Sequence, residues 1–192
     1  QADGSRSLPS ISRSGNRPDR PNSDRSVMLV LTGGEPTLAP QFDGLVEAGL
    51  EHGFYVAIET NGTRWRPGLE RADWICISPK VDVPQGSPAA HHNHHPLSAE
   101  LNSELLKRVG INSHLPISEF RYVVGPETTM PPYYAAYRHY VSPVVLSDGS
   151  GLEWKTGFPG FVPGALARCQ ELVWGDPRWR ISLQTHKLMG VR

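Results

Sequence analysis

Short apolar runs recur along the chain, and each one ends in a cluster of polar residues. The clearest is VMLVL at residues 27–31, which breaks into TGGEP at residues 32–36. The run is too short to span a membrane and lacks polar alternation, so it predicts a strand buried on both faces, as in a parallel sheet. Further strands are predicted at residues 54–58, 74–77, 119–124, 140–145 and 179–184.

Segments with helical spacing lie between these runs. Residues 40–52 and 165–174 predict helices, a short segment spans residues 66–71, and Ser98 is the predicted N-cap of a helix that ends at Gly110. The tyrosine-rich segment of residues 130–140 is more typical of a helix packed on a sheet than of a base-stacking surface. Strands alternating with helices predict an α/β fold with about six mostly parallel strands.

Parallel strands place their carboxyl ends on one side of the sheet, so the polar clusters are expected to converge there. Glu35, Glu59, Ser78 and Lys80 each follow a predicted strand and are expected to line a single pocket. Taken one at a time, Glu59 is also typical of a turn cap and Lys80 of a solvated surface lysine. Their shared position at strand ends favours the functional interpretation.

The cluster after the first strand has the composition of a binding loop. Gly33 and Gly34 carry no Cβ and so leave backbone groups accessible, while Glu35 offers a carboxylate for an ammonium group. The alternative is a tight strand-to-helix turn without a ligand. The spacing matches neither a P-loop nor the dinucleotide fingerprint GxGxxG.

Composition excludes several classes of protein. The chain has 19 basic and 19 acidic residues and no net charge, so no global field attracts nucleic acid or an anionic membrane. With no membrane-spanning stretch and no visible signal peptide, a cytoplasmic protein is expected. Cys76 and Cys169 are predicted to be small core residues. The histidines at residues 91–95 indicate a solvated insertion rather than a metal site, since no cysteine or acidic partner is near.

Residues 1–26 differ from the rest of the chain. They consist mainly of Ser, Arg, Pro, Asn, Asp and Gly, with too few apolar residues to offset the entropy of ordering. We therefore expect a disordered or altered segment at 1–26, a fragment end, linker or replaced segment, and a folded domain at 27–192.

Six motifs together resemble one enzyme family. They are LTGGEPTL (31–38), IETNGT (58–63), DWICISPK (73–80), EFRYVV (119–124), YVSPV (140–144) and PRWRISLQTHKLMGVR (177–192). In this order they resemble 7-carboxy-7-deazaguanine synthase, a radical S-adenosylmethionine (SAM) lyase of queuosine biosynthesis, the pathway of a tRNA modification. The resemblance implies a partial, open (β/α) barrel of the radical SAM type over residues 27–192.

The resemblance also implies a reaction and its cofactors. The family converts 6-carboxy-5,6,7,8-tetrahydropterin into 7-carboxy-7-deazaguanine and ammonia, using SAM, a [4Fe–4S] cluster and Mg²⁺. A homodimer and a flavodoxin-type reductant are expected, with no direct contact to nucleic acid or membrane. Another radical SAM enzyme that shares TGGEP is the alternative within the same superfamily.

Motif by motif, the resemblance implies site residues, although no catalytic residue is identified. The residues expected to contact SAM are Gly33, Gly34, Glu35, Ser78, Pro79, Lys80, Ser142 and Pro143. Those expected to contact the pterin are Thr32, Glu59, His186 and the carboxyl-terminal Arg192.

One departure from the family stands out. The family holds its cluster in a CxxxCxxC loop upstream of the GGE strand, with a Mg²⁺-binding threonine soon after, whereas residues 1–26 contain no cysteine. A cluster needs three thiolates at one place. We therefore expect an incomplete copy of the enzyme, unable to turn over alone, or a non-catalytic remnant that binds SAM or a partner subunit. An exposed sheet edge, with poor solubility or association, is expected as well.

Overall fold

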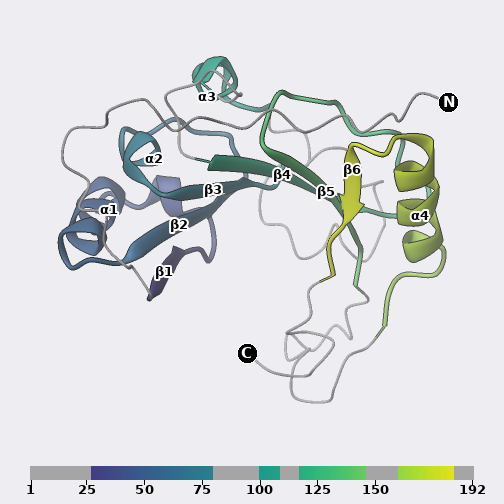
Figure 1. Cartoon of the computed structure of the whole chain (residues 1–192), viewed down its shortest axis with the longest axis horizontal. Helices are drawn as coiled ribbons and strands as arrows, with labels where there is room; N and C mark the ends of the chain where they lie inside the picture. The colour runs from purple at the N-terminus through teal and green to yellow at the C-terminus, as the bar shows by residue number, and fades with distance from the viewer. Residues whose placement is uncertain (1–26, 80–99, 109–116, 146–159, 184–192) are drawn as a thin grey trace, which may run out of the picture.

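Six parallel strands form one open sheet whose spatial order follows the chain (Figure 1). The structure is a computed structural model, and it describes residues 27–79, 100–108, 117–145 and 160–183. The strands are β1 (Met28–Leu31), β2 (Tyr55–Thr60), β3 (Trp74–Ile77), β4 (Ile117–Val124), β5 (Arg138–Pro143) and β6 (Trp179–Ile181). Every neighbouring pair is parallel, so all carboxyl ends meet at one edge. The predicted α/β class and the six-stranded open sheet are confirmed.

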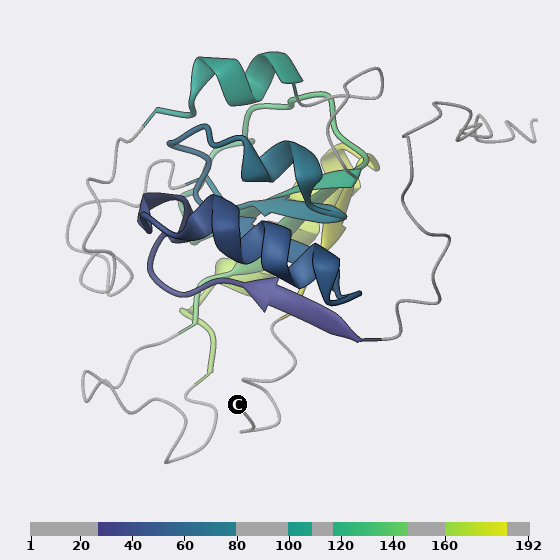
Figure 2. The ribbon, with the colours of Figure 1, turned by 90° about the vertical axis from the view of Figure 1, so that its left-hand side faces the viewer.

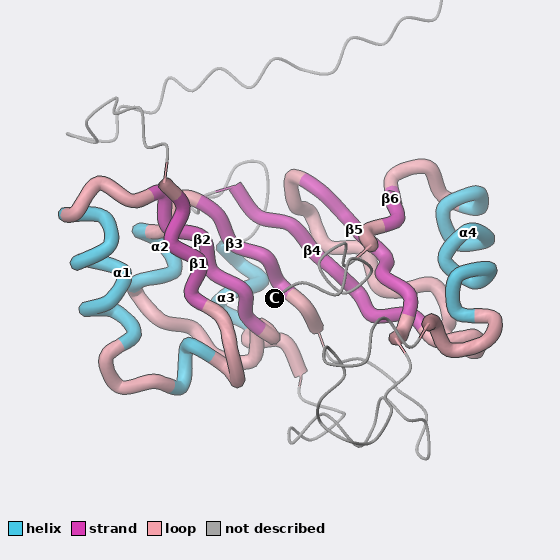
Figure 3. Tube along the Cα trace, turned by 90° about the horizontal axis from the view of Figure 1, so that it is seen from below, coloured by secondary structure: helices cyan, strands magenta, loops and turns pink. Residues whose placement is uncertain are grey.

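In the described part of the chain, the helices lie on one face of this sheet, and the other face, which carries no described helix, is called the uncovered face. They are α1 (Phe42–Glu51), α2 (Gly68–Arg71), α3 (Ser103–Arg108) and α4 (Ala165–Gly175), with a 3₁₀ turn, η1, at Pro36–Leu38. Seen from below, the strands lie in front of α3, with α1 and α4 at either side (Figure 3). The core between helices and sheet includes Phe42 and Val46 of α1, and Cys169 of α4.

Alternation along the strands explains why one face forms the core. In β2, Val56 and Ile58 are fully buried against the helices, while Glu59 on the opposite face is exposed. In β4, Phe120, Tyr122 and Val124 are buried in the same way. Side chains alternate between faces because the strand repeats every two residues. The residues between the core positions therefore belong to the uncovered face.

The prediction that the first strand is buried on both faces is wrong. Met28 is 58% exposed and Val30 43% exposed. Strand β1 is an edge strand of the described sheet and runs alongside α1, which covers its other side (Figure 2). An exposed apolar edge is therefore present in the described part of the chain, and the poor solubility or association inferred from it stays a prediction.

Other element boundaries also differ from the prediction. Helix α3 is capped by Asn102, whose Oδ1 accepts hydrogen bonds from the backbone N–H groups of Glu104 and Leu105. The predicted cap, Ser98, lies outside the described residues. Residues 130–137 contain no helix and lead directly into β5, because their tyrosines pack on the sheet from an extended segment.

Both cysteines are free and buried, as predicted. Within the four described ranges, no helix is long and apolar enough to cross a membrane. The predicted disordered segment at residues 1–26 lies outside the described residues.

His139 lies in an aromatic cluster on the helix side of β5. Its ring stacks 4.2 Å from the ring of Tyr133 and 6.1 Å from that of Phe120, and its Nε2 lies 2.6 Å from the carbonyl oxygen of Tyr134. Burial lowers the pKa of His139, with Arg178 acting in the same direction and the Tyr134 carbonyl and Asp176 opposing it. The folded protein therefore disfavours the imidazolium.

The sign of the resulting pH effect follows from linkage. An unfolded histidine takes up its proton near pH 6.5, whereas the folded chain takes it up at lower pH. Stability is therefore expected to fall as pH drops below about 6.5. Urea unfolding at pH 7 and pH 5 measures the effect, and H139Q, which keeps a donor for the Tyr134 carbonyl, should show a smaller decrease. An equal decrease in H139Q would assign the pH dependence to other groups.

Candidate functional site

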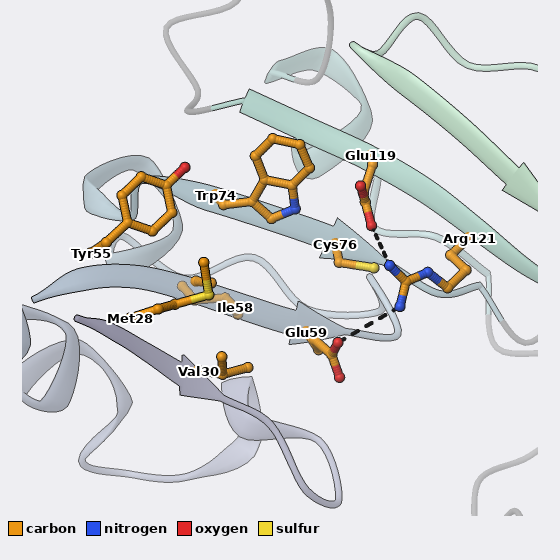
Figure 4. Close-up of a pocket in the computed structure, with 10 residues that line it drawn as sticks. Met28, Val30, Tyr55, Ile58, Glu59, Trp74, Cys76, Glu119 and Arg121 are labelled. Carbon is orange, nitrogen blue, oxygen red and sulfur yellow. Dashed lines mark hydrogen bonds and ion pairs between the residues drawn. The ribbon is translucent and has the colours of Figure 1, made fainter. Parts of the chain in front are cut away.

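A pocket of about 500 Å³ lies on the uncovered face of the sheet, a volume in the range of small-molecule sites (Figure 4). Its apolar part is formed mainly by Met28, Val30, Tyr55, Ala57 and Trp74, toward the amino ends of the strands. Its polar part comprises Glu59, Cys76, Glu119 and Arg121. A flat ring with hydrogen-bonding groups along one edge would match a pocket that has one apolar part and one polar part.

Alternating positions on three adjacent strands bring the polar part together. Glu59 is paired in register with Cys76, and Cys76 with Glu119. Arg121 follows Glu119 by two residues, so both face the pocket, while Phe120 between them enters the core. Glu119 and Arg121 are not among the site residues expected from the sequence. The signal was present, because two charged residues alternate with core residues in EFRYVV.

Charges in the polar part are closely spaced. Nη2 of Arg121 lies 2.6 Å from Oε1 of Glu119, and Nη1 lies 3.8 Å from Oε1 of Glu59. Burial acts to lower the pKa of Arg121, but the carboxylates of Glu119 and Glu59 act in the opposite direction, and the pKa is raised overall. Burial also raises the pKa of the Cys76 thiol well above its usual range, although Arg121 opposes this. Cys76 is therefore a protonated, unreactive wall of the pocket.

The glycine loop after β1 (residues 32–34) is joined to the pocket through Thr32. The hydroxyl of Thr32 donates to Oε2 of Glu59 at 3.0 Å. Gly33 and Gly34 have φ angles of 86° and 54°, and open space lies where a Cβ would project from each. The loop thus exposes backbone that a ligand can approach closely. The expected strand-end loop at Asn61-Gly62 is also present, since β2 pairs in parallel with β3.

Glu35 does not face the pocket. Its Oε1 accepts hydrogen bonds from the backbone N–H of Thr37 at 3.2 Å, from the Thr37 hydroxyl at 2.7 Å and from the Thr60 hydroxyl at 2.7 Å. Its Oε2 accepts one from the backbone N–H of Asn61 at 2.7 Å. The side chain is therefore a buried brace between two strand ends. Of the four residues expected to line a single pocket, Glu59 lies in its lining, whereas the Glu35 carboxylate does not.

The remaining predicted residues lie along the same edge or outside the described part. The backbone N–H of Ser78 donates to the carbonyl of Thr60, and its hydroxyl donates to the carbonyl of Arg121 at 3.0 Å. Pro79 is buried beside it, and Ser142 and Pro143 are buried at the end of β5. Lys80, His186, Arg192 and the histidines at 91–95 lie outside the described residues. Contacts of all these residues with SAM or a pterin stay predictions.

Cysteine chemistry sets a limit on what this chain can hold. Its two cysteines lie on β3 and α4, both buried, and burial raises the pKa of Cys169 to about 12. In the part of the chain that the structure describes, no three His, Cys, Asp or Glu side chains are grouped so as to hold a metal ion. Two buried thiols on separate elements do not fit a [4Fe–4S] cluster, which needs three thiolates at one place.

Comparison with known proteins gives consistent matches to one enzyme. The chain is 32% identical to 7-carboxy-7-deazaguanine synthase of Caulobacter vibrioides, over 85% of this chain and 59% of that protein. The proteins of the same name from Bradyrhizobium diazoefficiens and Burkholderia multivorans are 33% and 31% identical, over 88% and 89% of this chain and 62% of each of them. The chain thus spans about three-fifths of the length of these relatives.

The chain was also compared with protein-family models and with solved structures. No protein-family model matches the chain. The crystal structure of QueE from Escherichia coli superposes with a TM-score of 0.45 and 21% identity, over 82% of this chain and 56% of that chain. The resemblance predicted from the motifs is confirmed by the curated relatives: by sequence, the chain is a relative of the 7-carboxy-7-deazaguanine synthases.

Proposed function

We propose that this chain is the ligand-binding part of a 7-carboxy-7-deazaguanine synthase. In this proposal it holds SAM and a 6-carboxy-5,6,7,8-tetrahydropterin, which the enzyme converts into 7-carboxy-7-deazaguanine with release of ammonia. The observation that carries the proposal is the hydrogen bond between Thr32 of the glycine loop and Glu59 of the pocket. It joins the loop assigned to SAM to the residue assigned to the pterin.

Each ligand has residues of suitable chemistry. The exposed backbone of Gly33 and Gly34 suits the amino and carboxylate groups of the methionine part of SAM, because close approach needs positions without a Cβ. Ser78 and Pro79 extend this edge of the sheet. The Glu59 carboxylate suits the N–H donors of a pterin ring, which would pack against Trp74 and the exposed Val30.

The radical step is not assigned to residues of this chain, because its two buried cysteines do not fit the cluster. Anaerobic treatment with iron and sulfide is therefore expected to yield no [4Fe–4S] absorbance and no 5′-deoxyadenosine from SAM with this chain alone. Cluster formation with SAM cleavage would contradict that expectation. No Mg²⁺ ligands are assigned either.

The proposal for the glycine loop has a matched test. In G34A, a methyl group enters the open space over the loop, and SAM affinity measured by calorimetry is expected to fall by roughly tenfold or more. G53A is the control, since Gly53 also has a positive φ and open space around it but lies at the turn between α1 and β2. Equal SAM binding by the native chain and G34A would contradict the loop assignment.

A second candidate follows from the same cysteine observation. The chain then binds SAM or a partner subunit without turnover, and the family's homodimer is the proposed partner arrangement. Native mass measurement with SAM, with the pterin and with neither ligand separates the two cases. A stable complex that binds SAM but no pterin favours the non-catalytic function, whereas binding of both ligands favours the synthase.

A further inference from the structure

Glu119 and Arg121 form a short ion pair at the polar end of the pocket. Nη2 of Arg121 lies 2.6 Å from Oε1 of Glu119, whose side chain is buried beside Cys76. The guanidinium carbon of Arg121 also lies 5.9 Å from the ring centre of Tyr140 on β5. The guanidinium is thus held by one carboxylate and one aromatic ring.

Glu59 is held less tightly than Glu119. Nη1 of Arg121 lies 3.8 Å from Oε1 of Glu59, which is beyond hydrogen-bond distance, and the Glu59 side chain is 48% exposed. Its other oxygen accepts the Thr32 hydroxyl. Figure 4 shows the guanidinium between the two carboxylates, next to the Cys76 sulfur. Glu59 therefore keeps acceptor capacity on the pocket side.

Arg121 lies much closer to Glu119 than to Glu59, although the two carboxylates are chemically the same. One guanidinium serves both, and its Nε is buried with no hydrogen-bond partner in the described part of the chain. A free arginine prefers a two-bond contact with an accessible carboxylate. Here the short contact of the guanidinium is with Glu119 at 2.6 Å, and its contact with Glu59 is 3.8 Å long.

We infer that Glu119 and Arg121 are a positioning pair that keeps the Glu59 carboxylate open to two N–H donors of a 2-amino-4-oxopyrimidine ring. This inference rests on the proposed function, in which Glu59 contacts the pterin. Arg121 fixes the position of Glu59 through charge attraction, and Glu119 prevents Arg121 from occupying the edge of the carboxylate that the ligand needs. Neither residue is itself proposed to contact the ring.

Ligand discrimination tests the pair. Pterin-6-carboxylate carries the 2-amino donor, and lumazine-6-carboxylate has an oxygen there. The native chain is expected to bind the pterin at least about tenfold more tightly, since a lost donor leaves the carboxylate unpaired. E119Q and R121M are expected to lose most of this ratio, and R121K to recover part of it by restoring the charge.

Controls separate positioning from folding. R71M removes an arginine from an ion pair with Glu47 on the outer surface, 2.8 Å apart, and should leave the discrimination ratio unchanged. SAM affinity and the unfolding midpoint of each variant report on the fold. If E119Q and R121M prefer the pterin over the lumazine by the same ratio as the native chain does, the inference is wrong while the proposed function stands. If the folded native chain binds neither ring, the proposed function is wrong, and the pterin role of the pair with it.

A ligand-free measurement tests the geometry directly. In a crystal structure of E119Q, the guanidinium of Arg121 is expected to lie within hydrogen-bond distance of Glu59, in place of the 3.8 Å separation. A guanidinium that stays beside residue 119 at the original distance from Glu59 would overturn the restraining role of Glu119.

Discussion

Replacing Glu35 by alanine is expected to lower the free energy of unfolding by about 3 kcal/mol or more. The carboxylate is buried and accepts four hydrogen bonds, from the backbone and hydroxyl of Thr37, the hydroxyl of Thr60 and the backbone of Asn61. Without it, buried donors in η1 and at the end of β2 lose their acceptor. Each unsatisfied donor costs about 1–3 kcal/mol, partly offset where water enters. Urea unfolding followed by circular dichroism measures the change.

Two variants make this expectation specific. E35Q keeps the size of the side chain but turns an amide N–H₂ toward one of the donors, so it should lie between the native chain and E35A. E47A removes a carboxylate from α1 that pairs with Arg71 on the surface, and should cost less than about 1 kcal/mol. Equal small losses in E35A and E47A would show that the buried brace does not stabilise the fold.

Replacing Gly62 by alanine is expected to destabilise the chain by about 3 kcal/mol. Gly62 has a φ of 77°, a conformation that costs a residue with a Cβ about 1 kcal/mol. A Cβ there would also lie 2.6 Å from Cδ2 of Leu101 and 2.9 Å from Cγ2 of Ile77. Relieving such overlap in a packed region costs about 1–3 kcal/mol more.

Gly53 supplies the control for that expectation. Its φ is 80°, and nothing lies within 4 Å of where its Cβ would be. G53A therefore carries the backbone strain without the overlap and is expected to cost only about 1 kcal/mol. Thermal unfolding of both variants separates strain from packing, and equal losses would show that the loop moves away from Leu101 at little cost.

Much of the fold follows from the sequence because strand and helix patterns are local. The strand predicted at residues 74–77 has the same bounds as β3, since the run is apolar throughout and bounded by polar residues. Helix α4, predicted at residues 165–174, was correct to within one residue for the same reason. The helix expected near Met130 does not exist, because tyrosines that pack on a sheet do so equally well from extended backbone.

The candidate site was only partly predictable. Placement of Thr32, Glu59 and Ser78 at one edge followed from parallel strands. The orientation of each side chain did not. Glu35 and Glu59 are both glutamates that follow an apolar run. Glu35 is nevertheless buried and hydrogen-bonded to Thr60, whereas Glu59 faces the pocket. The alternation of side chains along a strand predicts that consecutive residues point to opposite faces of the sheet, but it does not predict which face the helices cover.

By itself, the sequence determined the order of strands, loops and helices, the edge of the sheet where polar residues gather, and the relationship to 7-carboxy-7-deazaguanine synthases. Those properties depend on local patterns and on motif identity. Only the tertiary structure decided that the helices lie on one face and that the Glu119–Arg121 pair lies beside Glu59. The physical reason is that burial and charge pairing arise between strands distant in the chain, where spacing along the sequence carries no information about which face is covered.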